Sequence, residues 1–156
     1  MWIWRITGAD YVDSAFSGAG AADHPGRWNH RGRLVGYASD SPALAMLEVL
    51  ANAETFAALK DRFIVRTMIS DELVYELPDQ DLPADWRVYP IPSSTRDLGE
   101  SWLLDGVYPA LSVPSAVMPL QRNILLNSEH EELGDIEVSD VVPLDFDIRL
   151  TEFGRG

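Results

Sequence analysis

The chain has 156 residues, no cysteine, and 25 acidic against 12 basic side chains, which gives a formal net charge of -13. Without cysteine it has neither disulfides nor thiolate metal sites, which favours a reducing cytoplasm, and its start lacks the basic segment of a signal peptide. No apolar run reaches the roughly 18 residues that span a membrane. Such acidity argues against direct binding of nucleic acid, whose phosphates need a basic face. The length predicts one domain over residues 1–156.

The first third of the chain predicts two strands, a loop and a helix. Aromatic and β-branched residues flank a glycine-rich segment, so we expect strands at residues 1–6 and 33–39 and a loop at residues 17–32. A helix is expected from Pro42 to about Phe56, because proline fits its first position and either Asp40 or Ser41 can cap it.

Further strands are predicted along the rest of the chain. The strands expected at residues 62–70 and 72–77 are joined by a tight turn near Ser70–Asp71 in this prediction. The segments with strand composition are residues 62–70, 72–77, 111–117, 122–127 and 136–146.

A second helix is predicted after the proline-rich loop of residues 78–92. Ser93 or Ser94 is expected to cap it, and it runs to about Leu104, where Gly106 closes it. Strands interrupted by two helices indicate a single α+β domain with mixed or antiparallel sheets, rather than a parallel βαβ sheet.

Glu48 is the one charged residue in the apolar helix pattern from Pro42 to Ala53. Two interpretations stay open. The glutamate lies on a narrow polar stripe that faces water, or it faces a cleft. In the second case, a lone acid in an apolar helix is a candidate catalytic carboxylate.

Three arginines, Arg27, Arg31 and Arg33, fall within seven residues in the loop segment RWNHRGR. Arginine forks match phosphate oxygens bidentately, which points to an anionic ligand. The alternative is a solvated basic loop that pairs with the protein's own carboxylates. The glycines form neither a P-loop nor a dinucleotide-binding fingerprint.

Other candidate groups are less specific. The three histidines lack the spacing of zinc ligands, so no metal site is expected. Ser115 lies in the segment VPSAVMP, where neighbouring prolines fix its backbone. It is interpreted either as a substrate-orienting serine or as a turn residue.

Taken in order, these segments resemble the RES-domain family, named for Arg, Glu and Ser, whose members are toxins of bacterial toxin–antitoxin pairs. Arg27 precedes Tyr37 by ten residues, and Tyr37 precedes Glu48 by eleven. The resemblance spans nearly the whole chain through WRIT, SGxGA, GRWN, a strand ending in Tyr, an S-P-x-x-A-x-L-E helix, VPSA and N-x-L-L-N.

The resemblance implies a fold akin to ADP-ribosyltransferases and cleavage of NAD+ at the nicotinamide–ribose bond by water or phosphate. NAD+ is then a substrate, and no cofactor or metal is expected. Depletion of NAD+ would arrest growth. Two other functions stay open: transfer of ADP-ribose to a protein, and a non-catalytic acidic module that binds a basic partner.

The resemblance also implies roles for individual residues. Glu48 is expected to stabilise the oxocarbenium-like transition state, and Arg27, helped by Arg5 or Arg31, to hold the pyrophosphate. Tyr37 is expected to pack on the nicotinamide or its ribose. The expected catalytic residues are Glu48, Arg27 and Tyr37, and the expected substrate-binding residues are Arg5, Asn29, Arg31, Ser93 and Ser115, of which one serine would be the family serine.

A protein partner is implied as well. It is a cognate Xre-like helix-turn-helix antitoxin that blocks the site, and the toxin is free to form a homodimer within that complex. The acidic composition, which otherwise serves solubility, is compatible with such a basic, DNA-binding partner.

Overall fold

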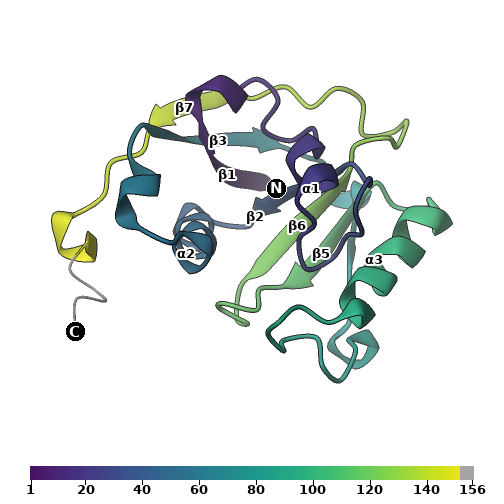
Figure 1. Cartoon of the computed structure of the whole chain (residues 1–156). Coiled ribbons are helices and arrows are strands. Elements are labelled where there is room, and N and C mark those ends of the chain that lie inside the picture. Colours follow the sequence, from purple (N-terminus) through teal and green to yellow (C-terminus); the bar gives the residue numbers. More distant parts are fainter. Residues whose placement is uncertain (152–156) are drawn as a thin grey trace.

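A mixed sheet of seven strands in the order β4-β5-β6-β2-β1-β3-β7 organises the chain (Figure 1). The computed structural model describes residues 1–151. Each neighbouring pair of strands in this part of the chain is antiparallel except β4 and β5, which are parallel. The predicted α+β class is confirmed. The strands are β1 (Trp2–Gly8), β2 (Val35–Ser39), β3 (Arg62–Met68), β4 (Val74–Glu76), β5 (Ala110–Pro114), β6 (Arg122–Asn127) and β7 (Asp140–Pro143).

The first predicted helix is α2 (Pro42–Asn52), and it begins as expected. The Ser41 hydroxyl accepts a hydrogen bond from the Leu44 N–H at 3.1 Å, and Pro42 takes the first position. The helix ends earlier than the predicted Phe56. At Ala53 the backbone turns to an extended conformation, with φ of -82° and ψ of 128°, and the Asn52 side chain donates to the Glu48 carbonyl at 2.8 Å.

The second predicted helix is α3 (Ser93–Asp105), whose end agrees with the prediction and whose start does not. Gly106 closes it in the left-handed conformation, with φ of 59°. Pro92 is the residue before the helix, and no side chain caps it. Ser94, one of the predicted caps, donates to Asp85 instead.

The predicted loop at residues 17–32 contains a short helix, α1 (Ala19–Asp23). The rest of this segment is held against α3. A Cβ added at Gly99 of α3 would lie 1.7 Å from the Trp28 carbonyl oxygen. Glycine is therefore required where the helix and the loop touch.

β3 and β4, the two strands expected to be joined by a tight turn, do not pair with each other. β4 pairs in parallel with β5 at the other end of the sheet. The reason is that β3 is already paired along both edges, with β1 over seven residue pairs and with β7 over four. The N-terminal amine holds the departing chain, since Met1 donates to the Ile69 carbonyl and to Asp71, each at 2.7 Å.

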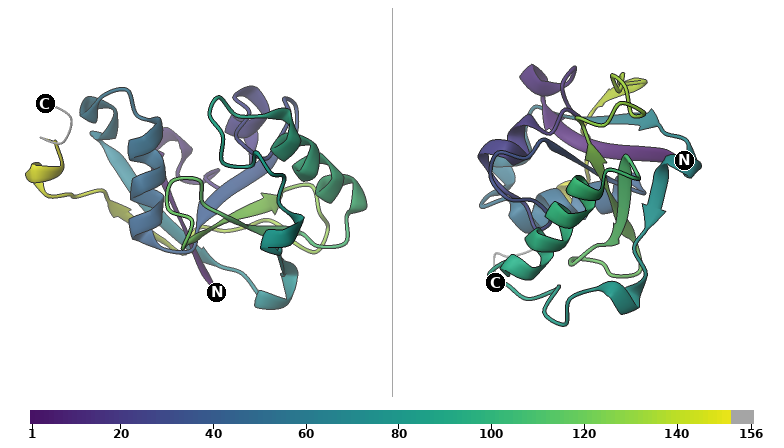
Figure 2. Two further views of the ribbon diagram at one scale, coloured as in Figure 1. Left: turned by 90° about the horizontal axis from the view of Figure 1, so that it is seen from below. Right: turned by 90° about the vertical axis from the view of Figure 1, so that its right-hand side faces the viewer.

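Alternation along the strands creates two apolar cores. On β6, Ile124 and Leu126 belong to a core that includes Ile3 and Val65, whereas Leu125 belongs to one that includes Trp102. The second core lies beneath α3 and the loop that carries Trp28. The left view of Figure 2 shows α2 and α3 toward opposite ends of the sheet. Within residues 1–151, no helix is long and apolar enough to cross a membrane.

The sheet is weakly joined between β1 and β2. These strands pair only at Trp4 and Ser39, whereas β2 and β6 pair over five residues. From this pair toward Arg5 on β1 and Tyr37 on β2 the strands are not paired, and this separation creates the space for the site.

Candidate functional site

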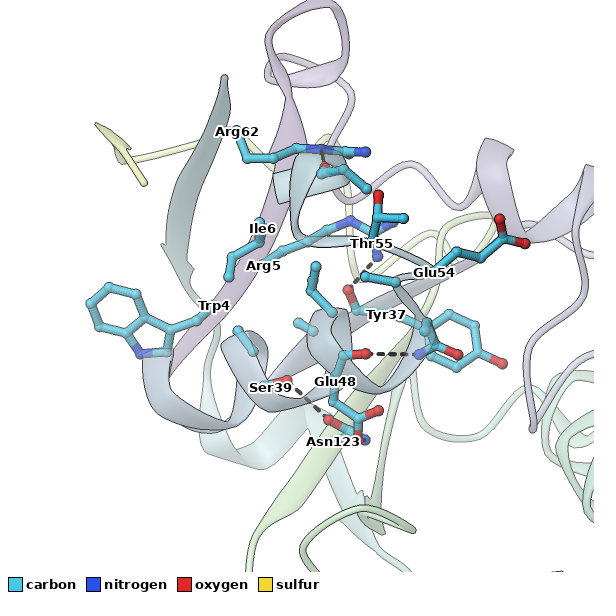
Figure 3. Close-up of a pocket in the computed structure, with 16 residues that line it drawn as sticks. Trp4, Arg5, Ile6, Tyr37, Ser39, Glu48, Glu54, Thr55, Arg62 and Asn123 are labelled. Atoms are coloured by element: carbon cyan, nitrogen blue, oxygen red, sulfur yellow. Dashed lines mark hydrogen bonds between the residues drawn. The ribbon is translucent and has the colours of Figure 1, made fainter. Parts of the chain in front are cut away.

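A cavity of about 650 Å³ opens where β1 and β2 separate, beneath α2 (Figure 3). Such a volume suits a small-molecule ligand. Arg5 and Arg62 lie toward one end of the cavity, and Glu48 and Asn123 lie toward the other. Tyr37 from β2 also lines it. The cavity therefore combines two arginines with two glutamates, Glu48 and Glu54, in a lining of polar and apolar side chains.

Glu48 faces this cavity, so the structure favours the cleft over the water-facing stripe. Its Oε1 accepts two hydrogen bonds, from the Ser115 hydroxyl at 2.7 Å and from the Asn123 amide at 2.6 Å. Its Oε2 has no hydrogen bond within residues 1–151 and is not buried. The carboxylate is thus fixed through one oxygen, while the other is open to a ligand.

Ser115, rather than Ser93, is the serine that meets the carboxylate. The Ser115 hydroxyl accepts from the N–H groups of Val117 and Met118 at 3.1 and 3.0 Å, so its own proton is directed to Glu48. The exposed fraction of Ser115 is 0%, and its hydroxyl reaches the cavity only through Glu48. Ser93 is exposed at the first residue of α3.

Tyr37 and Asn29 form a second polar unit beside the cavity. The Tyr37 hydroxyl donates to Asn29 Oδ1 at 2.8 Å and accepts from the Trp28 N–H at 3.0 Å. Burial raises the pKa of Tyr37 far above its usual range, and this outweighs the opposing effects of the Trp28 N–H and nearby arginines. The phenol is therefore neutral and its ring is available as an apolar wall.

Asn29 fixes the shape of the loop that carries Arg27. It is 0% exposed. Its Oδ1 also accepts from the Gly26 N–H at 2.9 Å, and its Nδ2 donates to the carbonyls of Ala21 and His30. With its side-chain groups engaged inside the protein, Asn29 reaches the cavity only through its contact with Tyr37.

Arg27 bridges two loops near the site. Its Nη1 donates to the carbonyls of Trp86 and Val88 at 2.8 and 3.0 Å. Burial lowers the pKa of Arg27 and the negative charge of Glu48 raises it, with burial the larger effect. Arginine stays charged under these conditions. Arg27 therefore places a cation within electrostatic reach of Glu48.

Arg5 fills the gap between the separating strands. Its Nη1 donates to the Tyr37 carbonyl at 2.6 Å, and its Nε is buried without a hydrogen-bond partner among residues 1–151. Burial lowers the pKa of Arg5. A buried donor without a partner is costly, so an acceptor supplied by a ligand would stabilise it.

Arg31, the alternative helper to Arg5, is exposed and does not line the cavity. Its neighbours dock on α3, where His30 contacts Asp97 at 2.7 Å and Arg33 pairs with Glu100. The structure therefore brings together Arg5, Tyr37 and Glu48, with Arg27 close by, and leaves Arg31 outside.

Arg62 and Asn123 are among the cavity residues that were not predicted as site residues. Arg62 opens β3, and its Nε donates to the Ala58 carbonyl at 2.9 Å. Nothing in its sequence context marks it. Asn123 lies in the N-x-L-L-N segment that carried the family resemblance, and that was the available signal.

The arginines divide into two groups. Within residues 1–151, Arg33, Arg66, Arg122 and Arg149 form ion pairs with carboxylates, and none of these four lines the cavity. No carboxylate of this part of the chain lies within ion-pairing distance of the two arginines that line the cavity, Arg5 and Arg62. The same holds for Arg27, Arg31, Arg87 and Arg96, which are not part of its lining. In a chain with 25 acidic side chains, the lack of a carboxylate partner for Arg5 and Arg62 within residues 1–151 favours an anionic ligand.

Among the described residues, no group of three or more His, Asp or Glu side chains is placed to hold a metal ion.

Comparison with known proteins identifies the family. The model of the RES domain matches residues 3–147. A relative from Yersinia enterocolitica named Toxin Res is 36% identical over 146 residues, which cover 94% of this chain and 95% of the relative. A relative from Sphingobium named Prs ADP-ribosylating toxin is 30% identical over 152 residues, which cover 94% of each chain. The chain belongs to the RES domain family, the family of these toxins.

A solved structure shares the fold. It is the crystal structure of the M. tuberculosis MbcT–MbcA toxin–antitoxin complex, with a TM-score of 0.72 and 22% sequence identity. The match covers 92% of this chain and 83% of that chain. At this identity the similarity establishes the architecture.

Proposed function

We propose that the chain is the toxin of a toxin–antitoxin pair and that it cleaves NAD+ at the nicotinamide–ribose bond. One observation carries the proposal. Glu48 presents a single free carboxylate oxygen to a cavity whose arginines have no carboxylate partner within residues 1–151. Membership of the RES domain family, whose relatives are named toxins, supports it.

The chemistry needs only one carboxylate. An O-glycosidase generally uses two, because one must protonate the leaving oxygen. The nicotinamide of NAD+ carries a positive charge and leaves as a neutral base with the electrons of the broken bond. Positive charge then develops on the ribose, where Glu48 Oε2 would stabilise it. Water or phosphate supplies the oxygen that bonds to the ribose carbon, and its proton passes to solvent.

The arginines would hold the anionic part of the substrate. Arg5 and Arg62 line the end of the cavity opposite Glu48. This separation matches a dinucleotide, whose pyrophosphate is one ribose away from the reacting bond. Guanidinium groups bind phosphate oxygens bidentately, and the buried Nε of Arg5 lacks a partner that such an oxygen would provide. Tyr37 would pack against the nicotinamide or its ribose.

A second reaction, transfer of ADP-ribose to a protein, uses the same site. The Sphingobium relative named Prs ADP-ribosylating toxin favours it. The bond that breaks is the same, and a nucleophile of the target protein replaces water or phosphate. The two reactions differ in where the ADP-ribose ends, so the mass of a candidate target protein distinguishes them.

An antitoxin partner is part of the proposal. The structural neighbour is a toxin–antitoxin complex, and we infer a cognate Xre-like antitoxin that covers the cavity. The net charge of -13 would favour a basic surface on that partner.

The decisive experiment measures nicotinamide release from NAD+ by the purified protein, with and without phosphate, beside Glu48→Gln. We expect release by the wild type and about 100- to 1000-fold less by the folded variant. Phosphate dependence would identify the acceptor. No release from folded wild type, free of any partner, would overturn NAD+ cleavage. Equal release by Glu48→Gln would overturn the role of Glu48.

A further inference from the structure

We propose that Asn123 is a positioning residue for Glu48 and that Ser39 fixes Asn123 in the required orientation. This inference rests on the proposed function, because it concerns the carboxylate of the same site. No role was assigned to either residue from sequence or family resemblance.

The contacts form a chain of hydrogen bonds with one direction. The Ser39 hydroxyl donates to Asn123 Oδ1 at 3.0 Å, and Asn123 Nδ2 donates to Glu48 Oε1 at 2.6 Å. An ionised carboxylate only accepts hydrogen bonds, so it requires the NH₂ side of the amide. The Ser39 proton on Oδ1 holds the amide in that orientation.

The sheet supplies the rigidity of this chain. Ser39 and Asn123 are directly opposite each other in the pairing of β2 with β6, and Ser39 is 4% exposed. Ser39 is also the residue at which β1 meets β2. Ser39 and Asn123 therefore lie where β1 and β2 begin to separate, and the backbone of Ser39 is paired with a strand on each side.

The geometry determines which carboxylate oxygen is free. Ser115 and Asn123 both donate to Oε1, one from the turn after β5 and the other from β6. Two donors from different elements prevent rotation of the carboxylate and leave Oε2 directed to the substrate. A carboxylate that is already held in its reactive orientation needs little reorganisation during the reaction. Removing a contact that orients such a group typically lowers activity by about 10- to 100-fold.

Other charges near Glu48 must be kept constant in a test. Arg5, Arg62 and Glu54 line the same cavity, and Arg27 lies within electrostatic reach. None of them is changed in the variants proposed here.

The test compares Asn123→Asp and Ser39→Ala with wild type and with Asn52→Asp as a matched control. Asn52 lines the same cavity, but its amide donates to the Glu48 backbone carbonyl rather than to the carboxylate. The readouts are kcat and KM for nicotinamide release, the pH profile of kcat, and an NMR titration of the ¹³C-labelled Glu48 carboxyl without substrate.

We expect Asn123→Asp to lower kcat by about 10- to 100-fold with little change in KM. Its added negative charge beside Glu48 should move the acid limb of the pH profile and the NMR titration to higher pH by about one unit or more. Asn52→Asp should move the acid limb of the pH profile and the NMR titration by less than Asn123→Asp does. Ser39→Ala should lower kcat and move the titration in the same direction as Asn123→Asp, but by less. It replaces Asn123→Asp as the test if that variant does not fold.

Three results would overturn the proposal. The first is an NMR titration of Glu48 in Asn123→Asp or Ser39→Ala that coincides with wild type. The second is a shift in Asn52→Asp as large as in Asn123→Asp. The third is a rise in KM at unchanged kcat, which would indicate direct substrate binding. The titration needs no turnover, so absence of nicotinamide release in wild type would refute the proposed function separately.

Discussion

Ser115 and Glu48 are 67 residues apart in the chain, and the serine hydroxyl lies 2.7 Å from the carboxylate. If the hydroxyl turned its proton elsewhere, it would lose the hydrogen bonds that it accepts from two backbone N–H groups. The contact therefore joins the turn after β5 to the middle of α2, and it determines how the acid of the site is presented.

Replacing this serine should affect both rate and stability. We expect Ser115→Ala to lower kcat for nicotinamide release by about 10- to 100-fold. The free energy of unfolding should fall by about 1–3 kcal/mol, because two N–H groups lose their acceptor. Urea unfolding and initial rates measure the two effects. Ser93→Ala is the comparison, and an equal loss of rate there would contradict the choice of Ser115.

Arg62 and Arg31 provide a second contrast. Arg62 lines the cavity and Arg31 does not. We expect Arg62→Ala to raise KM for NAD+ by about 10-fold or more, because a charge-assisted contact to phosphate is lost. Arg31→Ala should change it by less than about twofold. Steady-state kinetics at constant ionic strength measures both, and the reverse order would show that the substrate lies over the loop instead of in the cavity.

The buried phenol of Tyr37 predicts a loss of stability in alkali. Its pKa is raised by burial in the folded protein, whereas an unfolded tyrosine titrates near about 10. Above that pH the unfolded state releases the proton first, so the free energy of unfolding falls as pH rises, by up to about 1.4 kcal/mol per unit for this group. Urea unfolding between neutral pH and pH about 11 should show a smaller decline in Tyr37→Phe. Identical slopes in the two proteins would contradict it.

Gly26 should be sensitive to any side chain. A Cβ at this position would lie 2.7 Å from the Tyr37 hydroxyl. We expect Gly26→Ala to displace Tyr37 and lower the free energy of unfolding by about 1–3 kcal/mol. Gly20→Ala is the matched control in the same segment, because its Cβ meets nothing within 4 Å and α1 favours alanine. Thermal or urea unfolding compares them, and equal effects would remove the specific role of Gly26.

Local patterns predicted the elements better than their pairing. Ser41 and Pro42 at the start of α2 and Gly106 at the end of α3 act through neighbouring residues, and these predictions are confirmed. β3 and β4 follow each other along the chain but do not pair, because β1 and β7, from distant parts of the chain, occupy both edges of β3. Adjacency in sequence gave no information about that pairing.

In the candidate site too, some residues are marked by the local sequence and others are brought to the cavity only by the fold. Glu48 stands out because it is the one charge in an apolar helix, and the family spacing marks Arg27 and Tyr37. The sequence left the serine undecided, since only the approach of the turn after β5 to α2 separates Ser115 from Ser93. Arg62 reaches the cavity because β1 and β2 separate, and a single residue pair between two strands has no sequence signature.

The two arginines of the cavity, Arg5 and Arg62, have no carboxylate partner within residues 1–151, and this affects how fast an anionic ligand binds and leaves. At long range the chain repels an anionic nucleotide through its net charge of -13, while at contact the cavity attracts it. Dissolved salt screens the first effect over about 10 Å at 0.1 M and acts less on groups that are partly buried. Moderate ionic strength should therefore speed the encounter of ligand and protein, and the dissociation rate should change much less.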